Sequence, residues 1–580
     1  MKPAVLRKGS RSRILAAVIL GIAAIFVVRL FYLQIIQHGH YVALAQTEQM
    51  TKERIPAKRG EIYALSNGTP VKMVLNETVY TVFVDPAVIA DTSKVADVMK
   101  KVAGGNLRTG FEELLERSET RYQIIANKVT RLQAEKIKEA GLKGIGFQAV
   151  SQRVYPEQKL ASQVLGFVDT EGVGKYGLEG YMNDELTGKD GRLETVTDVS
   201  DVPLTIGNRN VREPAVDGQN IVMTIDRNIQ SKVQDVIAEK ANKLGADTIS
   251  AVVMNPNTGQ VMAMANYPDY NPAEYNKVED AALFNNNAIT KIYEPGSTVK
   301  TFTMATGIDK NVAKASDTFN NTDTLRVGDW TIGNATRGKT GIISFQTAMN
   351  WSLNTGFVTI GQRLGNGENI TRSARDTMYE YFHDKFRLGQ RSGIELQNES
   401  AGSIVSPELT DGNEVRYSNM TFGQGMDSTV IQVANGFSTL INGGNYYKPT
   451  VIAGNMVDGT YVPKAAPQPE QAGVISASSS QQLKDMIQEA RASSFGAVDK
   501  KGYNIGGKTG TSQIPTAGGY SDTETIASYV GFGGGNTPEY VIMVSVYGKD
   551  KVFQGARDAL PIFTDISNWM LDYLEIQPKG

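Results

Sequence analysis

The chain has 580 residues, of which 41% are hydrophobic and 21% charged, an ordinary globular composition with room for two or three domains. A net charge of −2 argues against a nucleic-acid-binding surface, because no basic excess exists to neutralise phosphates. The absence of cysteine excludes disulfides and thiolate metal sites. The three histidines (His38, His40 and His383) are too few for a histidine-based zinc site or a credible Ser-His-Asp triad.

The N-terminus predicts a membrane anchor over residues 14–36. This run is apolar except for Arg29 and Gln34, and its 23 residues, at a helical rise of about 1.5 Å each, would span a hydrocarbon layer of about 30 Å. Five basic residues precede the run, so residues 1–13 are expected in the cytoplasm and the remaining chain outside. A cleaved signal peptide is the alternative, since Ala43-Leu44-Ala45 resembles an A-x-A site. The run is, however, long for a signal sequence, and the site lies far beyond its core.

The next part of the chain shows mixed helix and strand patterns without obvious chemistry. A helix is expected from residue 37 to about 50, an extended segment over 54–63 and a strand over 78–85. Two or three charged helices are expected between residues 111 and 140. The glycines between residues 172 and 191 predict turns and not a phosphate loop, because the order strand, Gly-x-Gly-x-x-Gly, helix is absent.

From about residue 216 the pattern changes to strands alternating with longer helices. The order of these elements favours an α+β domain, with an antiparallel sheet that carries helices on its faces. The expected strands are 220–226, 250–254, 259–265, 503–514, 527–532 and 540–547. The expected helices are 228–243, one that begins near Ser297, 344–364, one that follows Gly423-Gln424-Gly425 and runs through Leu440, and 564–574.

The segment from Tyr293 to Lys300 holds the one Ser-x-x-Lys pair of the chain. Pro295 and Gly296 precede an apolar run, so Ser297 is expected in the first turn of a helix. Positions i and i+3 share a helix face, which lets the Lys300 amine reach the Ser297 hydroxyl. A serine becomes a nucleophile when a base takes its proton, and a lysine can be that base if burial or a nearby cation lowers its pKa.

Alone, a Ser-x-x-Lys pair is weak evidence, because a chain of this length contains one or two by chance. Ser352-Leu353-Asn354 and Lys508-Thr509-Gly510-Thr511 follow it in order and complete the three-motif set of β-lactamases and penicillin-binding proteins. Without Ser297 upstream, Ser352 would be taken for an ordinary helix serine and Asn354 for a cap. A second Lys-Thr-Gly, at residues 339–341, precedes Ser352 and is predicted to lie in a loop, so Lys508 is preferred.

With these motifs the chain resembles the class B penicillin-binding proteins, which are monofunctional peptidoglycan D,D-transpeptidases. The resemblance covers nearly the whole chain. It departs from the family at Ala64-Leu65, where an Asp-Arg pair is usual, and at Gly533-Gly534-Gly535, which fits the usual family sequence at that place less closely. It includes Arg59-Gly60, Tyr155-Pro156, Gly177-Leu178-Glu179-Gly180, Met254-Asn255-Pro256 and Thr421-Phe422-Gly423-Gln424-Gly425.

The resemblance implies a transpeptidase domain of the serine β-lactamase type, with a five-stranded antiparallel sheet between helices, over residues 216–580. It implies an elongated α+β stalk over residues 37–215, which follows the transmembrane helix. No metal or cofactor is required.

The resemblance also implies roles for the motif residues. Ser297 attacks the penultimate D-Ala of a stem peptide, Lys300 is the base and Ser352 relays the proton to the leaving amine. The further roles are substrate binding by Asn354, Thr509, Gly510 and Thr511, carboxylate recognition by Lys508, and an oxyanion hole formed by the backbone N–H groups of Ser297 and Thr511.

The expected partners are stem peptides, β-lactams and, because no residues remain for a glycosyltransferase, a polytopic SEDS-type glycan polymerase of the divisome or elongasome. The resemblance places the catalytic domain outside the bacterial cytoplasmic membrane. A β-lactamase or D,D-carboxypeptidase would need neither anchor nor stalk. A β-lactam sensor would carry several spans and a cytoplasmic output domain, and an inactive scaffold would normally have lost a motif.

Overall fold

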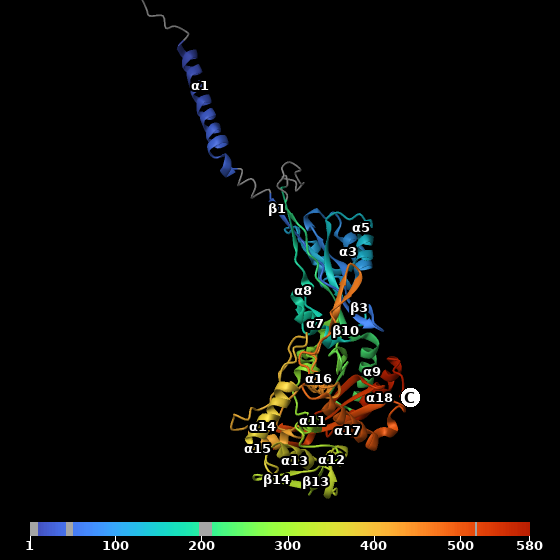
Figure 1. The fold of residues 1–580 in the computed structure, drawn as a ribbon. Helices are drawn as coiled ribbons and strands as arrows, with labels where there is room; N and C mark the ends of the chain where they lie inside the picture. Colours follow the sequence, from blue (N-terminus) through green and yellow to red (C-terminus); the bar gives the residue numbers. More distant parts are fainter. Residues whose placement is uncertain (1–9, 42–49, 197–210, 517–518, 580) are drawn as a thin grey trace, which may run out of the picture. The chain divides into compact units, whose positions relative to one another are not determined.

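The computed structural model describes residues 10–41, 50–196, 211–516 and 519–579. The chain divides into two compact units, one made of residues 1–58 with 188–218 and the other of residues 59–187 with 219–580. Figure 1 shows the elements of both in sequence colours.

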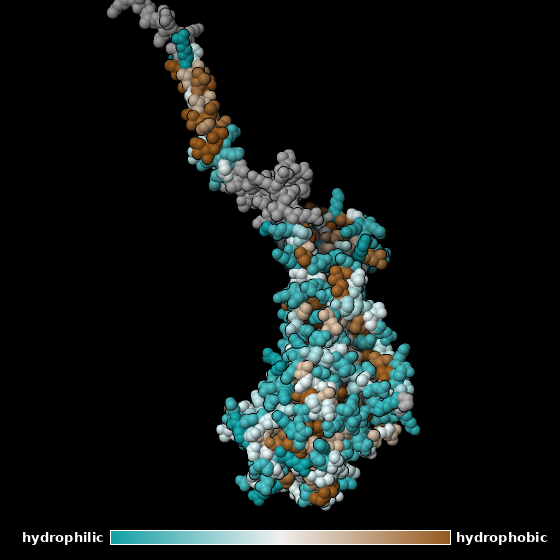
Figure 2. Space-filling model, viewed as in Figure 1, coloured by the Kyte–Doolittle hydropathy of each residue, from teal (hydrophilic) through white to brown (hydrophobic). Residues whose placement is uncertain are grey.

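The first unit contains the predicted membrane helix and a small sheet. Helix α1 (Ser10–Phe31) continues as a π-helical turn, η1 (Tyr32–Ile36). Among the described residues, only Arg11–Ile36 is long and apolar enough to cross a membrane, and none of it is buried. Figure 2 shows hydrophobic side chains along its length. Most of the helix expected over 37–50 lies outside the described residues. The sheet has the strand order β1-β8-β9, with β1 Met50–Ile55, β8 Gly191–Val196 and β9 Val211–Glu213.

The second unit contains a seven-stranded sheet that unites segments far apart in sequence. Its order is β18-β17-β10-β2-β3-β4, and β5 also pairs with β3. β10 lies between the hairpin β17–β18 on one side and β2, the first strand after Arg59, on the other (Figure 1). The sheet therefore includes strands from distant parts of the second unit's sequence. The bounds are β2 Ile62–Ser66, β3 Thr69–Val84, β4 Gln123–Thr130, β5 Ile145–Val154, β10 Asn220–Asp226, β17 Ile452–Val457 and β18 Thr460–Pro463.

Three helices cover part of this sheet, and here one prediction is wrong. Residues 111–140 are not purely helical, because strand β4 lies between the short helices at either end. Ala126 and Val129 of β4 pair with β3, and both are buried together with Ile125. This tertiary pairing outweighs the charged, helix-like local sequence. The helices are α3 Thr92–Ala103, α4 Phe111–Leu115 and α5 Arg131–Glu139.

The second sheet is five-stranded and antiparallel, as expected, in the order β12-β11-β21-β20-β19. Helices α9 and α18 bury one face, and α11, α16 and α17 pack on the other. β10 was expected in this sheet and belongs to the first one. The bounds are β11 Thr248–Met254, β12 Val261–Tyr267, β19 Asn504–Thr516, β20 Gly519–Gly534, β21 Pro538–Tyr547, α9 Arg227–Leu244, α11 Lys300–Asp309, α16 Val430–Ile441, α17 Ala477–Phe495 and α18 Leu560–Tyr573.

The helix predicted over residues 344–364 is two helices, α12 (Phe345–Trp351) and α13 (Asn354–Leu364). Ser352 ends α12 in a left-handed conformation, with φ 55° and ψ 41°. The sequence conceals the break because Leu353, which is fully buried, keeps the apolar spacing across it. Two small antiparallel sheets of two strands each lie against these helices (Figure 1): β13 (Thr318–Asn321) with β16 (Gly341–Ser344), and β14 (Thr324–Val327) with β15 (Trp330–Gly333).

Candidate active site

Ser297 lies in a 3-10 turn, η6 (Gly296–Val299), that leads directly into α11. The turn is wedged between two backbone segments. Gly296 has φ +59°, and a Cβ there would lie 2.8 Å from the carbonyl oxygen of Thr511. On the other side, the Gly296 N–H donates to the carbonyl of Gly423 at 3.0 Å. The start of the serine helix is therefore fixed between strand β19 and the Gly423 loop, where no side chain fits at position 296.

Lys300 is fully buried one turn after Ser297, as the spacing predicts. Its Nζ lies 3.0 Å from Ser297 Oγ and 3.0 Å from Ser352 Oγ. It also donates to the Ser352 carbonyl at 2.6 Å and to Asn354 Oδ1 at 2.7 Å. The amine thus contacts both candidate hydroxyls of the site and is oriented by two carbonyl-type oxygens.

The break between α12 and α13 brings the second motif to this amine. The left-handed turn at Ser352 directs both its carbonyl and its hydroxyl to Lys300 Nζ. Asn354 then begins α13, and its Nδ2 donates to the carbonyl of Gly333 at 2.8 Å. A continuous helix would separate these groups, so the conformation that the sequence did not predict is the one that assembles the motif.

Lys508 projects from β19, the edge strand of the five-stranded sheet, and is 4% exposed. Its Nζ lies 2.9 Å from Ser352 Oγ and also donates to Thr509, at 3.1 Å to the carbonyl and 3.3 Å to Oγ1. Ser352 Oγ therefore lies between two lysine amines.

Lys339, the lysine of the second Lys-Thr-Gly motif, contacts a different side chain. Lys339 precedes β16 in a loop, and its Nζ lies 3.9 Å from the centroid of the Trp351 ring.

Burial lowers the pKa values of both lysines, and the charge of Lys508 adds to the shift of Lys300. Burial, followed by the charge of Lys508, lowers the pKa of Lys300 well below its ordinary value. Burial lowers the pKa of Lys508 to about 7. Two ammonium groups on either side of one hydroxyl repel each other, so the charge on one amine favours the neutral form of the other. A neutral Lys300 beside Ser297 Oγ can accept its proton.

A cavity of about 620 Å³ opens over these groups. Of the predicted residues, Ser297, Ser352, Asn354, Thr509 and Thr511 line it, while Lys300 and Lys508 lie buried beneath. Gly510 is not among the lining residues. A Cβ at this position would lie 2.9 Å from the carbonyl oxygen of Pro295, so its missing side chain allows β19 to approach the serine turn.

Sequence reasoning missed several residues of this cavity. Trp351, Arg337 and Asn419 gave no motif signal, whereas Phe422 and Gln424 belong to a segment of the family resemblance. The other lining residues without a signal are Thr331, Ile332, Gly333, Asn334, Ala335, Thr336 and Gln513.

Glu294, three residues before Ser297, is a buried carboxylate that does not line the cavity. Its carboxylate accepts from the Gly425 N–H at 2.7 Å and from Tyr520 Oη at 3.1 Å, and burial raises the pKa of Glu294 to about 6.

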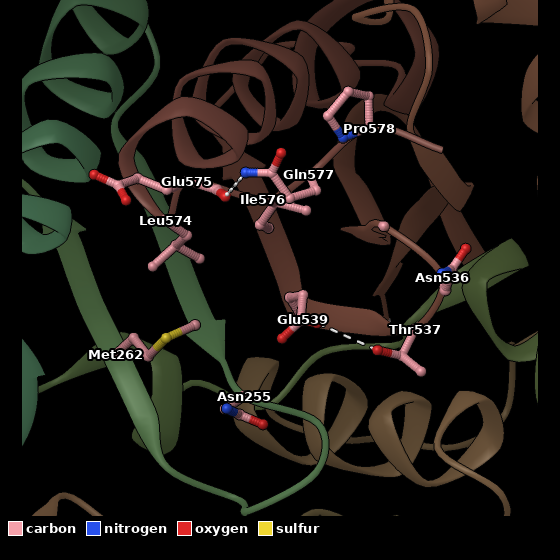
Figure 3. A pocket seen from close by; sticks show the side chains of 11 residues that line it. Asn255, Met262, Asn536, Thr537, Glu539, Leu574, Glu575, Ile576, Gln577 and Pro578 are labelled. Atoms are coloured by element: carbon pink, nitrogen blue, oxygen red, sulfur yellow. Dashed lines mark hydrogen bonds between the residues drawn. The ribbon is translucent and has the colours of Figure 1, made fainter. Parts of the chain in front are cut away.

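A second cavity, of about 570 Å³, lies in another part of the same unit (Figure 3). Leu574, Ile576 and Met262 form its apolar side, and Glu539 accepts a hydrogen bond from Thr537 on the opposite side. None of the predicted site residues lines it, so the chemistry belongs to the cavity over Ser297.

Comparison with known proteins identifies the family of the chain. Residues 249–568, more than half of the chain, match the penicillin binding protein transpeptidase domain family. The chain belongs to this family. Residues 54–223 match the penicillin-binding protein dimerisation domain, which accompanies the transpeptidase domain here. The resemblance to class B penicillin-binding proteins is thereby confirmed, and the chain is a serine-type D,D-transpeptidase.

Relatives match over nearly the whole length. Stage V sporulation protein D of Bacillus subtilis is 29% identical over 578 residues, 98% of this chain and 87% of the relative. The probable peptidoglycan D,D-transpeptidase PenA of Neisseria meningitidis is 24% identical over 97% of this chain and 93% of its own. The crystal structure of penicillin binding protein 3 from Mycobacterium tuberculosis, complexed with aztreonam, shares the fold with a TM-score of 0.67. That likeness has 22% identity and covers 91% of this chain and 98% of the other.

Proposed function

We propose that the chain is a membrane-anchored peptidoglycan D,D-transpeptidase that cross-links stem peptides through an acyl-enzyme on Ser297. The observation that supports this most directly is the position of Lys300 Nζ, 3.0 Å from both Ser297 Oγ and Ser352 Oγ. A buried amine with a lowered pKa can take a proton from one hydroxyl and return it through the other.

Acylation begins when neutral Lys300 removes the Ser297 proton and Ser297 Oγ attacks the carbonyl of the penultimate D-Ala. The negative charge on the tetrahedral oxygen is met by the backbone N–H groups of Ser297 and Thr511. Two features support an oxyanion hole formed by these two N–H groups. Ser297 lies at the start of a helix, and the turn packs against the β19 backbone at Thr511.

The second half of acylation moves the proton to the leaving group. Lys300 passes it through Ser352 Oγ to the departing D-Ala nitrogen, and the C–N bond breaks. Lys508, which contacts the same hydroxyl, attracts the terminal carboxylate of the donor together with Thr509 and Thr511.

An acceptor amine from a second stem peptide then attacks the ester, and the same groups act in reverse. Asn354 holds the acyl-side amide, since its Oδ1 and Nδ2 are fixed by Lys300 and Gly333. β-Lactams enter the same reaction because their strained amide resembles the D-Ala-D-Ala bond, and the homologous solved structure carries aztreonam.

Residues 14–36 anchor the enzyme in the bacterial cytoplasmic membrane, with residues 1–13 inside and the catalytic domain outside. The exposed apolar helix and the basic residues ahead of it support this orientation. The stalk (37–215) and transpeptidase (216–580) divide the remaining chain, and a SEDS-type polymerase supplies the glycan strands.

Labelling with fluorescent penicillin tests the nucleophile. Ser297→Ala should lose covalent labelling while its unfolding midpoint stays near that of the wild type, because the variant removes only one oxygen. Ser403→Ala, a serine outside the cavity lining, is the control and should label normally. Undiminished labelling of Ser297→Ala would show that another residue is acylated. Release of free D-Ala from a pentapeptide, measured on the same samples, extends the test to the natural donor.

A further inference from the structure

One charged side chain lines the active-site cavity and takes no part in the chemistry above. Arg337 lies in the loop between β15 and β16, and no aspartate or glutamate is among the described residues that line the cavity. Its guanidinium is exposed, and no hydrogen bond or ion pair engages it within the described chain. A cavity with one free guanidinium and no acidic wall is complementary to an anion.

The loop that carries Arg337 is fixed on both sides. Asn334 is 4% exposed, and its Nδ2 donates to Asn321 Oδ1 at 3.1 Å. Gly338 N–H donates to Asp323 at 2.6 Å, and the carbonyl of Lys339 accepts from Asn321 at 2.8 Å. Arg337 is therefore held at the tip of an anchored loop, which reduces the entropy lost when it binds a ligand.

Asp323 is an acidic group that the charge of this guanidinium influences. The hydrogen bond from the Gly338 N–H, with smaller contributions from the amides of Asn334 and Asn321 and from the charge of Arg337, lowers the pKa of Asp323. The carboxylate of Asp323 is thus already occupied by these three hydrogen-bond donors. Asp323 does not line the cavity. The Arg337 charge thus remains available on the cavity side.

The position of Arg337 indicates which part of a substrate it would meet. Its Nη2 lies 4.0 Å from the point where a Cβ of Gly333 would be, and the Gly333 carbonyl accepts from Asn354. Arg337 is therefore on the Asn354 side of Ser297, whereas Lys508 and Thr509 supply the group that binds the terminal carboxylate. With Asn354 on the acyl-side amide, the side chain that follows along the donor is that of the residue before D-Ala-D-Ala.

We propose that Arg337 forms a second anion subsite, which binds a carboxylate on the side chain of the third stem-peptide residue of the acyl donor. This specificity rests on the proposed transpeptidase function. A bidentate guanidinium–carboxylate pair in this cavity favours a donor such as a diaminopimelyl peptide over the same peptide with that carboxylate amidated. A charge-assisted hydrogen bond of this kind corresponds to a preference of about tenfold or more.

A matched pair of peptides tests the subsite. Both are N-acetylated pentapeptides ending in D-Ala-D-Ala, and they differ only in whether the third side chain ends in a carboxylate or a carboxamide. The measurement is the peptide concentration that halves the rate of fluorescent-penicillin labelling of the full chain. The wild type should need about tenfold less of the carboxylate peptide. Arg337→Gln should bring the ratio near one, and Arg337→Glu should favour the carboxamide peptide.

Arg326→Gln is the matched control. Arg326 lies on the neighbouring strand β14, pairs with Asp329 at 3.6 Å and does not line the cavity. This variant should keep the wild-type ratio. A wild-type ratio near one, or an unchanged preference in Arg337→Gln or Arg337→Glu, would overturn the subsite. Equal weakening of both peptides would do so too, because it would place the contact elsewhere on the donor. Failure of the transpeptidase proposal would appear separately, as labelling that persists in Ser297→Ala.

Discussion

At the scale of single residues, the site is defined by two lysines that share one hydroxyl. Ser352 Oγ lies 3.0 Å from Lys300 Nζ and 2.9 Å from Lys508 Nζ, and both amines are buried. The two titrations are coupled, so the protons leave the pair in two steps below the usual lysine range. The proposed mechanism needs the state in which Lys300 is neutral and Lys508 charged.

The first prediction concerns the pH dependence of acylation. The second-order rate should rise with pH as Lys300 loses its proton and fall again as Lys508 is deprotonated, with the falling side near Lys508's pKa of about 7. Lys508→Ala should slow acylation about 10²-fold or more. It should also move the rising limb to higher pH, because loss of a neighbouring positive charge raises the pKa of Lys300. Stopped-flow acylation from pH 5 to 10 measures both.

Lys339→Ala is the control for this prediction, since Lys339 belongs to the other Lys-Thr-Gly and its Nζ lies over the ring of Trp351, not beside Ser352 Oγ. Its rate and pH profile should match the wild type. A rising limb that stays in place in Lys508→Ala would mean that the two amines are not coupled.

Much of the residue-level site could be predicted from sequence because its parts are local or ordered motifs. Ser297 and Lys300 meet through i, i+3 spacing, and Lys508 was distinguished from Lys339 by its strand context. Arg337 could not be predicted. It reaches the cavity through a loop whose conformation depends on hydrogen bonds to Asn321 and Asp323, residues that carry no motif.

At the scale of elements, close backbone approach decides where the serine turn lies. Gly423 has φ +85°, and a Cβ there would lie 2.0 Å from the carbonyl oxygen of Gly296. The Gly296 N–H also donates to the Gly423 carbonyl. The Gly423 loop and the turn before Ser297 are thus in direct backbone contact. No flexible side chain lies at this contact, so an added methyl group could be accommodated only by moving the backbone.

The second prediction follows from this contact. Gly423→Ala should slow penicillin acylation at least tenfold, because the new methyl group must displace Gly296 and with it Ser297. Gly367→Ala is the matched control. Gly367 has φ +91° but open space around it, so this variant carries the strain of about 1–2 kcal/mol without the clash. It should lose some stability and keep its acylation rate. Equal acylation rates for Gly423→Ala and Gly367→Ala would show that the contact between Gly296 and Gly423 does not position Ser297.

The elements that the sequence predicted best are those with a strong local signal. Strands β11, β12 and β21 are buried apolar runs, and their predicted and observed positions agree within a few residues. The predictions failed where tertiary contacts override local pattern. β4 lies in a charged, helix-like stretch, and the break at Ser352 is hidden by continuous apolar spacing.

At the scale of the whole molecule, buried charges connect segments that are distant in sequence. Glu179 is fully buried and accepts from Arg59 Nε at 2.8 Å and from Arg153 Nε at 2.7 Å. Arg153 also donates to Asn76 at 2.8 Å. One carboxylate thus holds together the start of the second unit, the end of β5 and helix α7 (Gly177–Tyr181).

The third prediction tests this network. Glu179→Gln should lower the free energy of unfolding by about 3–5 kcal/mol, because two guanidinium groups lose their counter-charge in a buried site. Glu112→Gln is the control, since Glu112 pairs with Lys100 on the surface and its loss should change the free energy of unfolding far less. Denaturant unfolding of the detergent-solubilised proteins measures both. Similar losses in the two variants would show that the buried cluster contributes no more than a surface pair.

The fourth prediction concerns the N-terminal helix and the proposed polymerase. The helix is apolar over Arg11–Ile36, and Gly21, Ala23 and Ala24 form a small-residue patch on which a neighbouring helix could pack closely. Replacing residues 14–36 with an unrelated single span of equal length should weaken co-purification with a SEDS-type polymerase and impair wall synthesis. Penicillin labelling should stay normal, because every group that contacts Ser297 lies beyond residue 290.

A narrower control separates packing from anchoring. Gly21→Leu with Ala24→Leu keeps an apolar span of the same length but fills the small-residue patch, so it should reproduce the loss of co-purification while the protein stays in the membrane fraction after a high-salt wash. If both altered spans retain the polymerase and support growth, the helix acts only as a tether. Recognition of the polymerase would then have to come from residues beyond this helix, in the proposed stalk over residues 37–215.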